Sequence, residues 1–527
     1  MRLFRWNRAS DDEPESPLPW VGLPSIAAFL SDWDGQAPLP DEPPKDDNEV
    51  RFAPGALDGI LSHHSSGGDG GTREHKVARL LDLVENAADK SDDQSRAAFY
   101  RAVQEDEALQ LADDLSEAIA GQKSFGPHQL HPLALWLHAH AAHRGPFKIA
   151  LVLMGLCGHE TDVPPLIEAA RHPEFTLYAL VAASNVTSDP TEVWWQMARE
   201  ADGWGKIHLV ERLAQLAFDN VELQSWLLRE GCANSIMDEY LAWTCAQYGD
   251  LRGALERGEH DDELLESAGR ILVALTIGGP AQDMSDYEDG PAVMCLYLET
   301  LETRCDTAAG LYTVISLDRF LTRIAEGTEE NGPDWRDLGW TPDVVAQQRA
   351  LCAAIMEQLE WPARLKQELN GDAYWQAWEC AKALDLDLWE RLFARLQEKP
   401  TEAHLYSCLL NGQSTERQLR VAEFARTHLP LQEITSAPLH SLFTSDPASF
   451  CLDILVWAMK SEEGIVFFDE VLVEAALRAP SLRTRNGAIA VLEMQPRSEW
   501  GPLLTATVRQ RQRDEPDESI RQRLKRL

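Results

Sequence analysis

The 527-residue sequence lacks the signatures of most enzyme classes. It has neither a GxGxxG pattern after a strand-like run nor a GxxxxGK[ST] phosphate-binding loop, the glycine patterns that bind dinucleotides and nucleotides. The HExxH zinc motif and the GxSxG elbow of serine hydrolases are also missing. The glycine-rich run Gly67–Thr72 follows no strand-like run, so we interpret it as a linker. No catalytic residue can be assigned, and no cofactor-binding motif is evident.

Paired cysteines and long apolar runs are absent as well. The sequence has nine cysteines, an odd number, with no CxxC pair and most of them inside apolar helical stretches, which predicts reduced and buried thiols. The first seventeen residues contain no apolar run ahead of their charges, so a secretory signal is not expected. The longest apolar stretch, Ile149–Cys157, is about half of what a bilayer requires. We therefore predict a cytoplasmic protein without membrane insertion.

Basic residues are few. The sequence has 48 lysines and arginines but 86 acidic residues, which gives a formal net charge of -38. Such a surface repels phosphate backbones and anionic lipids, so nucleic acid and membranes are poor partners, whereas a basic protein would be attracted. A second interpretation is that the charge only keeps a large protein soluble.

Residues 1–73 are rich in proline, aspartate, glycine and serine, a composition that buries too little apolar surface to offset its ordering entropy. We predict a flexible acidic arm. Two apolar patches, Trp20–Leu30 and Phe52–Leu61, stand out within it. They could dock on the rest of the chain or bind a partner, and docking is the interpretation we favour.

From Glu74 onward, helical patterns of about 10 to 18 residues alternate with short breaks. The pattern is strongest between His131 and Gln215, where apolar residues recur at i, i+3 and i+4 and we expect helices to end at Gly145-Pro146, Gly158 and Pro173. Amphipathic helices joined by short links pair antiparallel. Because the pattern continues over hundreds of residues, the predicted fold is all-α, an irregular α-solenoid of HEAT-like or armadillo-like hairpins.

Two acidic or glycine-rich insertions, Gly278–Gly290 and Glu326–Trp340, interrupt the helices. We expect the chain to divide near residue 335, into an N-terminal helical half at 74–335 and a C-terminal half at 336–527. The C-terminal end reads as a hairpin followed by a basic closing helix. Its polar outer face would cap the solenoid through Arg509, Arg511, Arg513, Arg521, Arg523, Lys525 and Arg526.

Histidines are concentrated in the first half, and His138, His140 and His143 form a candidate metal site. Neutral imidazoles on one helix bind zinc, nickel or iron when a further ligand converges on them. The nearest further ligands follow the next helix, where the hairpin would carry them to the opposite end: His159, Glu160 and Asp162. In the alternative interpretation His138 packs beside Trp136 while His140 and His143 face solvent.

The sequence contains seventeen tryptophans, many of them near predicted helix ends. Most should fill gaps between stacked hairpins. Because tryptophan is over-used as a binding anchor, a minority could line a groove for a cationic peptide or basic protein. The candidate partner-binding residues are Trp194, Trp195, Trp335 and Trp340.

Two runs resemble helical pairs of bacterial HEAT-like repeat proteins: GPFKIALVLMGLCGHETDVPPLIEAARHPEFTLYALVAASN and RNGAIAVLEMQPRSEWGPLL. The group they resemble is the one to which the name limonene hydroxylase has been attached, and the likeness spans residues 130–527. The resemblance implies NAD(P)H-linked oxidation of a monoterpene, with dehydrogenation of the alcohol product. It transfers no catalytic residue, because the matching runs contain no nucleotide, haem, flavin or iron motif.

Three functions follow as hypotheses. The first is a cytoplasmic HEAT-like scaffold that binds a protein partner, with a basic protein as one candidate, and has no chemistry of its own. The second is the NAD(P)H-dependent monoterpene oxidoreductase that the resemblance implies. The third, a special case of the first, is an immunity-type protein that neutralises a basic toxin.

Overall fold

The computed structural model describes residues 18–35, 37–42, 52–59, 70–105, 108–122, 126–258, 260–327, 333–436, 446–462 and 464–527. Throughout these ranges the regular elements are helices, and the one β-type pairing found there is an isolated antiparallel bridge between Lys460 and Ile465. The predicted all-α class is confirmed. Within the same ranges, no helix is both long and apolar enough to cross a membrane.

The described residues separate into two compact units, which meet in sequence between Tyr287 and Glu288. The division therefore lies within the first predicted insertion, Gly278–Gly290, and not near residue 335. The reason is that the helices on either side of the second insertion, α17 (Ala308–Glu326) and α18 (Pro342–Met356), pack closely against each other and belong to one unit.

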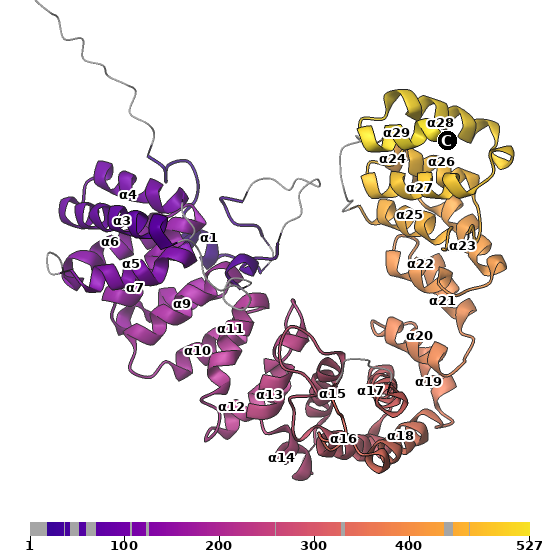
Figure 1. The fold of residues 1–527 in the computed structure, drawn as a ribbon, viewed down its shortest axis with the longest axis horizontal. Coiled ribbons are helices and arrows are strands. Elements are labelled where there is room, and N and C mark those ends of the chain that lie inside the picture. The colour runs from indigo at the N-terminus through magenta and orange to yellow at the C-terminus, as the bar shows by residue number, and fades with distance from the viewer. Residues whose placement is uncertain are drawn as a thin grey trace, which may run out of the picture. The chain divides into compact units, whose positions relative to one another are not determined.

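Unit 1 contains the N-terminal helices (Figure 1). The elements are α1 (Ile26–Ser31), α3 (Gly70–Lys90), α4 (Asp93–Glu105), α5 (Ala108–Ala120), α6 (Pro127–His140), α7 (Arg144–Cys157), η1 (Glu160–Asp162), α8 (Val163–Ala170), α9 (Pro173–Val186), α10 (Thr191–Glu200), α11 (Gly203–Ala214), α12 (Val221–Trp226), the π-helical turn η2 (Leu227–Gly231), η3 (Asp238–Tyr240), α13 (Ala242–Tyr248), α14 (Leu251–Glu256) and α15 (Asp262–Ile277).

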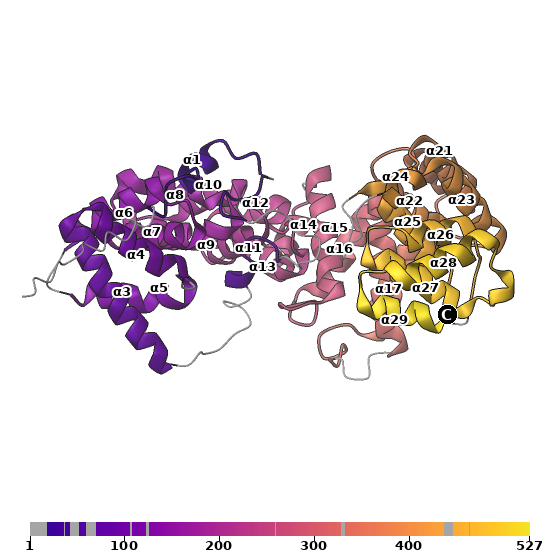
Figure 2. The same ribbon diagram turned by 90° about the horizontal axis from the view of Figure 1, so that it is seen from above.

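Within unit 1, helices α7, α9, α11, α13 and α15 pack one after another, each on the next. Helices α6, α8 and α10 lie in a second layer beside them, and each contacts the helix that follows it in sequence (Figure 2). The inner side chains are apolar and almost fully buried, as the periodic stripes predicted; examples are Leu151, Leu180 and Leu209.

Glycine and proline mark the helix boundaries. Gly158 caps the end of α7, as predicted, but the other two predicted ends lie on the opposite side of the boundary. Gly145 and Pro146 lie in the first turn of α7, and Pro173 is the first residue of α9. A proline in the first turn sacrifices no hydrogen bond, because the first amides of a helix have no partner within it. These residues therefore begin the following helix. Gly70–Thr72 likewise lie inside α3 and not in a linker.

Unit 2 contains the C-terminal helices, among which α17, α25 and α26 each pack against several other helices. The elements are α16 (Gly290–Arg304), α17 (Ala308–Glu326), α18 (Pro342–Met356), α19 (Trp361–Glu368), α20 (Tyr374–Ala383), α21 (Trp389–Glu398), α22 (Ala403–Leu410), α23 (Thr415–His428), α24 (Leu431–Ser436), α25 (Pro447–Ala458), α26 (Glu470–Leu477), α27 (Leu482–Met494), η4 (Arg497–Glu499), α28 (Pro502–Asp514) and α29 (Glu518–Arg526).

The closing hairpin α28–α29 is tied to unit 2 by charge as well as by apolar packing. Glu515 is buried and its two carboxylate oxygens meet Arg485 at 3.2 Å and Arg511 at 2.9 Å. Arg511, predicted on the polar outer face, is therefore buried and faces inward. Its neighbours Arg509 and Arg513 are more exposed.

Three described stretches of the predicted N-terminal arm are packed within unit 1, and we call them the strap: residues 18–35, 37–42 and 52–59. Helix α1 contacts α6 and α8, and its residues Ile26 and Leu30 are buried. The predicted docking of the first patch is confirmed, and the prediction of a flexible arm is wrong for the strap. Residues 1–17, 36, 43–51 and 60–69 lie outside the described residues.

Candidate functional site

The three histidines of the predicted metal site each have a different partner. The His138 ring lies against Phe147, with ring centroids 5.0 Å apart. His140 stacks on Trp136 at 5.0 Å, and His143 is hydrogen-bonded through Nδ1 to the Tyr100 hydroxyl at 2.9 Å. In the part of the chain that the structure describes, no group of three or more His, Cys, Asp or Glu residues is placed to hold a metal ion.

The candidate further ligands lie beside another histidine. Asp162 accepts hydrogen bonds from the His159 amide and from His131 Nε2, both at 2.8 Å. Burial works to raise the pKa of Asp162, but these hydrogen bonds hold it below the usual value. His131 lies in the first half of α6, nearer its start than His138. The hairpin therefore carries these candidate ligands away from the end of α6 that bears His138, as the sequence predicted. The contact fixes the α7–η1 turn to the start of α6.

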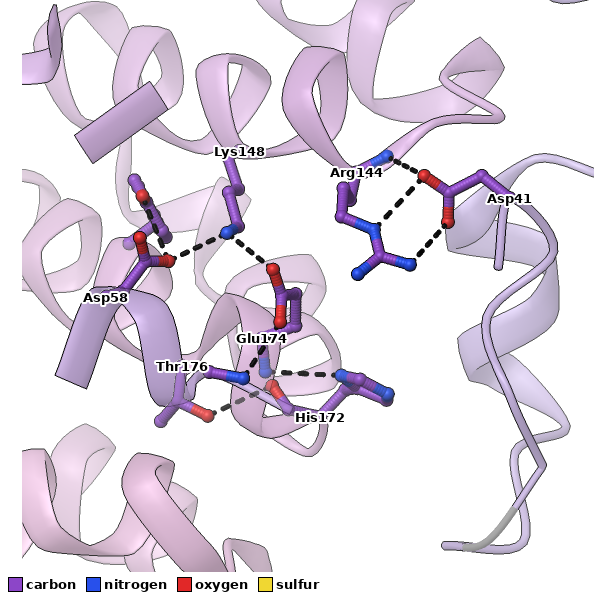
Figure 3. A network of polar contacts seen from close by, with 9 residues as sticks. Asp41, Asp58, Arg144, Lys148, His172, Glu174 and Thr176 are labelled. Carbon is purple, nitrogen blue, oxygen red and sulfur yellow. Dashed lines mark hydrogen bonds and ion pairs between the residues drawn. The ribbon is translucent and has the colours of Figure 1, made fainter. Parts of the chain in front are cut away.

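A network of polar contacts lies beneath the strap, on helices α7 and α9 (Figure 3). At its centre, the Lys148 ammonium meets Asp58 at 2.7 Å and Glu174 at 2.6 Å. Tyr178 donates a hydrogen bond to the same oxygen of Asp58 at 3.2 Å. Burial works to raise the pKa of Glu174, but the nearby Lys148 holds it below the usual value.

A second ion pair lies next to this centre, where Asp41 of the strap accepts from the Arg144 amide at 2.8 Å and from the Arg144 guanidinium at 3.3 Å and 3.5 Å (Figure 3). Although burial alone would lower it, the Asp41 carboxylate raises the pKa of Arg144. Asp41 and Asp58 are thus the two acidic anchors of the strap. Neither pair could be predicted from the sequence, because Asp58 and Lys148 are 90 residues apart and Asp41 and Arg144 are 103 residues apart.

Main-chain contacts complete the docking of the strap. Arg171 donates to the carbonyls of Leu30 and Trp33, and the Gly55 amide donates to Glu174 at 2.8 Å. Gly55 has φ +75°, and a Cβ there would lie 2.5 Å from the carbonyl oxygen of Pro173. Only glycine permits this approach.

His138 and His172 make the stability of unit 1 sensitive to acid. Burial lowers the pKa of each to about 4, from an ordinary value near 6.5. Below pH 6.5 the unfolded chain binds protons that the folded chain does not, so stability present above 6.5 is lost as the pH falls toward 4. We expect each histidine to lower the free energy of unfolding by about 2 kcal/mol at pH 5 relative to pH 7.

Urea unfolding at pH 7 and pH 5 measures this loss. His138→Phe should reduce the difference in the free energy of unfolding between pH 7 and pH 5 by about 2 kcal/mol. His140→Gln, on the exposed end of the same helix, serves as the matched control and should leave the difference unchanged. Equal pH dependence in wild type and His138→Phe would contradict the expectation.

The predicted partner-binding tryptophans divide into two pairs. Trp194 donates its indole N–H to the Leu180 carbonyl at 2.9 Å, and Trp195 is 7% exposed, packed on Trp226 and Arg199. These two tryptophans fill the space between helices, the structural role predicted for most of the tryptophans.

Trp335 and Trp340, by contrast, line a pocket of about 620 Å³ in unit 2. Their ring centroids are 6.3 Å apart, and both rings contact Phe320 of α17 edge-on. Trp340 is only 1% exposed, yet its indole N–H has no hydrogen-bond partner among the described residues. A buried donor without a partner costs free energy, which a ligand that supplies an acceptor would recover.

The remaining wall of this pocket comes from the end of α17 and the start of α18. Pro342 and Val345 are apolar, while Glu326, Asp334 and Arg336 are exposed at its edge. The volume lies within the range of pockets that hold small ligands or side chains. The pocket thus combines aromatic walls with charges of both signs at its edge. No protein-family model, curated protein or solved structure matches the chain.

Proposed function

We propose that this protein is a HEAT-like helical-repeat scaffold that binds a protein partner, and that the pocket of Trp335 and Trp340 holds one side chain of that partner. The observation that carries the proposal is the buried, unpaired indole N–H of Trp340 in a pocket walled by a second tryptophan. Peptide carbonyls are abundant acceptors, and buried aromatic residues dominate protein-binding sites.

Charge favours a basic partner. The net charge of -38 attracts cationic chains, and the partly exposed ring of Trp335 offers a surface on which a lysine or arginine side chain can stack. An immunity-type role against a basic toxin is one form of this proposal. The monoterpene oxidation implied by the resemblance stays a prediction that no described contact favours.

Peptide binding tests the proposal. A library of basic hexapeptides is screened against the full chain, and the best binder is labelled and followed by fluorescence polarisation. Trp340→Phe keeps an aromatic ring but removes the donor, so we expect about fivefold weaker binding, the equivalent of one hydrogen bond of about 1 kcal/mol. Trp335→Ala should weaken binding at least tenfold, because it removes a wall of the pocket.

Trp375→Ala is the matched control, since Trp375 is 38% exposed in unit 2, packs on Tyr312 and does not line the pocket. Circular dichroism melting of all three variants separates lost binding from lost folding. If Trp375→Ala and Trp335→Ala weaken binding equally, or if no basic peptide binds, the proposal is wrong.

A further inference from the structure

The strap makes contacts that a separate polypeptide could also make. Arg171 recognises two main-chain carbonyls, the Ala141 carbonyl accepts from the Ile26 amide at 2.7 Å, and Glu174 accepts from the Gly55 amide. The contacts of Arg171 and of the Ala141 carbonyl do not depend on side-chain identity, whereas the Gly55 contact requires glycine at that position. The surface therefore offers main-chain contacts to a bound segment and adds selectivity through a few side chains.

The side-chain contacts select for carboxylates. The strap contributes the carboxylates of Asp41 and Asp58, and the helices contribute Arg144 and Lys148 to meet them. Without the strap, Lys148 would keep its pairing with Glu174 and Arg171 its pairing with Glu200, whereas Arg144 would lose the carboxylate of Asp41. In a chain of net charge -38, this surface is locally cationic once the strap leaves it.

The strap also leaves much of its own apolar surface unused. Four of its large apolar side chains are exposed by 42% to 66% of their area: Val21, Leu23, Phe52 and Leu57. A segment retained only to cover the core would be expected to bury such residues. A competing segment with the same charges and a better apolar fit would gain about 25 cal/mol for each Å² of additional buried area.

We propose that the surface of α7 and α9 beneath the strap is a binding site for an acidic segment of another protein, and that the strap occupies this site in the free chain. The partner segment carries two carboxylates, one for Arg144 and one for Lys148, and displaces the strap when it binds. The site lies in unit 1 and uses neither Trp335 nor Trp340, so it is independent of the tryptophan pocket.

A peptide of residues 18–59 is the probe, because it already carries the two carboxylates. It is labelled and titrated against the full wild-type chain and against the full chain bearing Asp41→Asn and Asp58→Asn, which weakens the internal strap. We expect at least tenfold tighter binding to the variant. The same peptide with both aspartates changed to asparagine should bind the variant at least tenfold more weakly, and added salt should weaken only the acidic peptide.

Equal affinity for the two chains, equal affinity of the two peptides, or a dimer of the variant in sedimentation would overturn the proposal. A dimer would show that the surface takes the strap of a second copy. Melting curves establish that the variant is folded.

Hydrogen exchange on the wild-type chain gives a second test that needs no variant. The amides of Ile26 and Gly55 should exchange at least tenfold faster than the buried amides of α7, because the strap opens while the helices remain folded. Excess acidic peptide should speed the exchange of these strap amides further. Exchange of the strap and of α7 at one common rate would show that the strap is part of the cooperative core and would overturn the proposal.

Discussion

Replacing Lys148 by methionine is expected to lower the free energy of unfolding by about 3–5 kcal/mol, the usual cost of leaving buried charges without their partner. Methionine keeps most of the side-chain volume, so the loss reports charge and not packing. The carboxylates of Asp58 and Glu174 would remain, 11% and 12% exposed, with no ammonium between them. Urea unfolding followed by circular dichroism measures the change.

Lys382→Met is the matched control for this substitution. Lys382 pairs with Glu379 at 3.0 Å, but the lysine side chain is 47% exposed, so its loss should cost less than about 0.5 kcal/mol. Adding Asp58→Asn and Glu174→Gln to Lys148→Met should recover most of the stability, because it removes the unpaired charges. A loss below about 1 kcal/mol in Lys148→Met would contradict the role assigned to the ion pair.

Glu515→Leu should have a similar effect in unit 2, with an expected loss of about 4 kcal/mol. Glu515 is 1% exposed and is shared by Arg485 and Arg511, which are themselves 1% and 6% exposed. Without the carboxylate, two buried guanidinium groups face each other. Arg485 keeps its hydrogen bonds to the carbonyls of Ala479 and Pro480, which limit the loss.

The neighbouring Glu518→Leu is the control, because Glu518 pairs with Arg521 at the exposed start of α29 and its side chain is 59% exposed. We expect a change within about 0.5 kcal/mol. Thermal unfolding of both variants provides the comparison. If the two substitutions cost the same, charge burial does not hold the closing hairpin in place.

Much of the helical fold was predictable, because it depends on patterns a few residues long. Apolar residues at i, i+3 and i+4 marked α6 to α11, and side chains such as Thr307 and Ser414 cap helix starts as their chemistry predicts. The side of a boundary on which proline falls was not predictable in this way. A proline such as Pro173 can follow the end of one helix or occupy the first turn of the next. The sequence does not distinguish these two positions, and in the structure Pro173 begins α9.

The candidate sites were less predictable, because their residues come together only in the folded chain. Two of the four predicted tryptophans line the pocket in unit 2, and the general preference for tryptophan as an anchor was enough to nominate them. The strap contacts join residues 90 to 141 positions apart and have no local pattern. The histidines of the predicted metal site are close in sequence but do not share a site in the fold. His138 and His140 lie on one helix, but each ring packs against its own aromatic neighbour.

The cysteines have a practical consequence. All nine are free thiols, and eight are buried, leaving Cys295 of α16 as the partly exposed one. Burial raises the pKa of Cys232 and Cys245 in unit 1 and of Cys305 and Cys352 in unit 2. A maleimide dye added to the native protein should therefore attach first at Cys295. Later labelling, followed by peptide mass spectrometry under rising urea, would record the order in which the two units open.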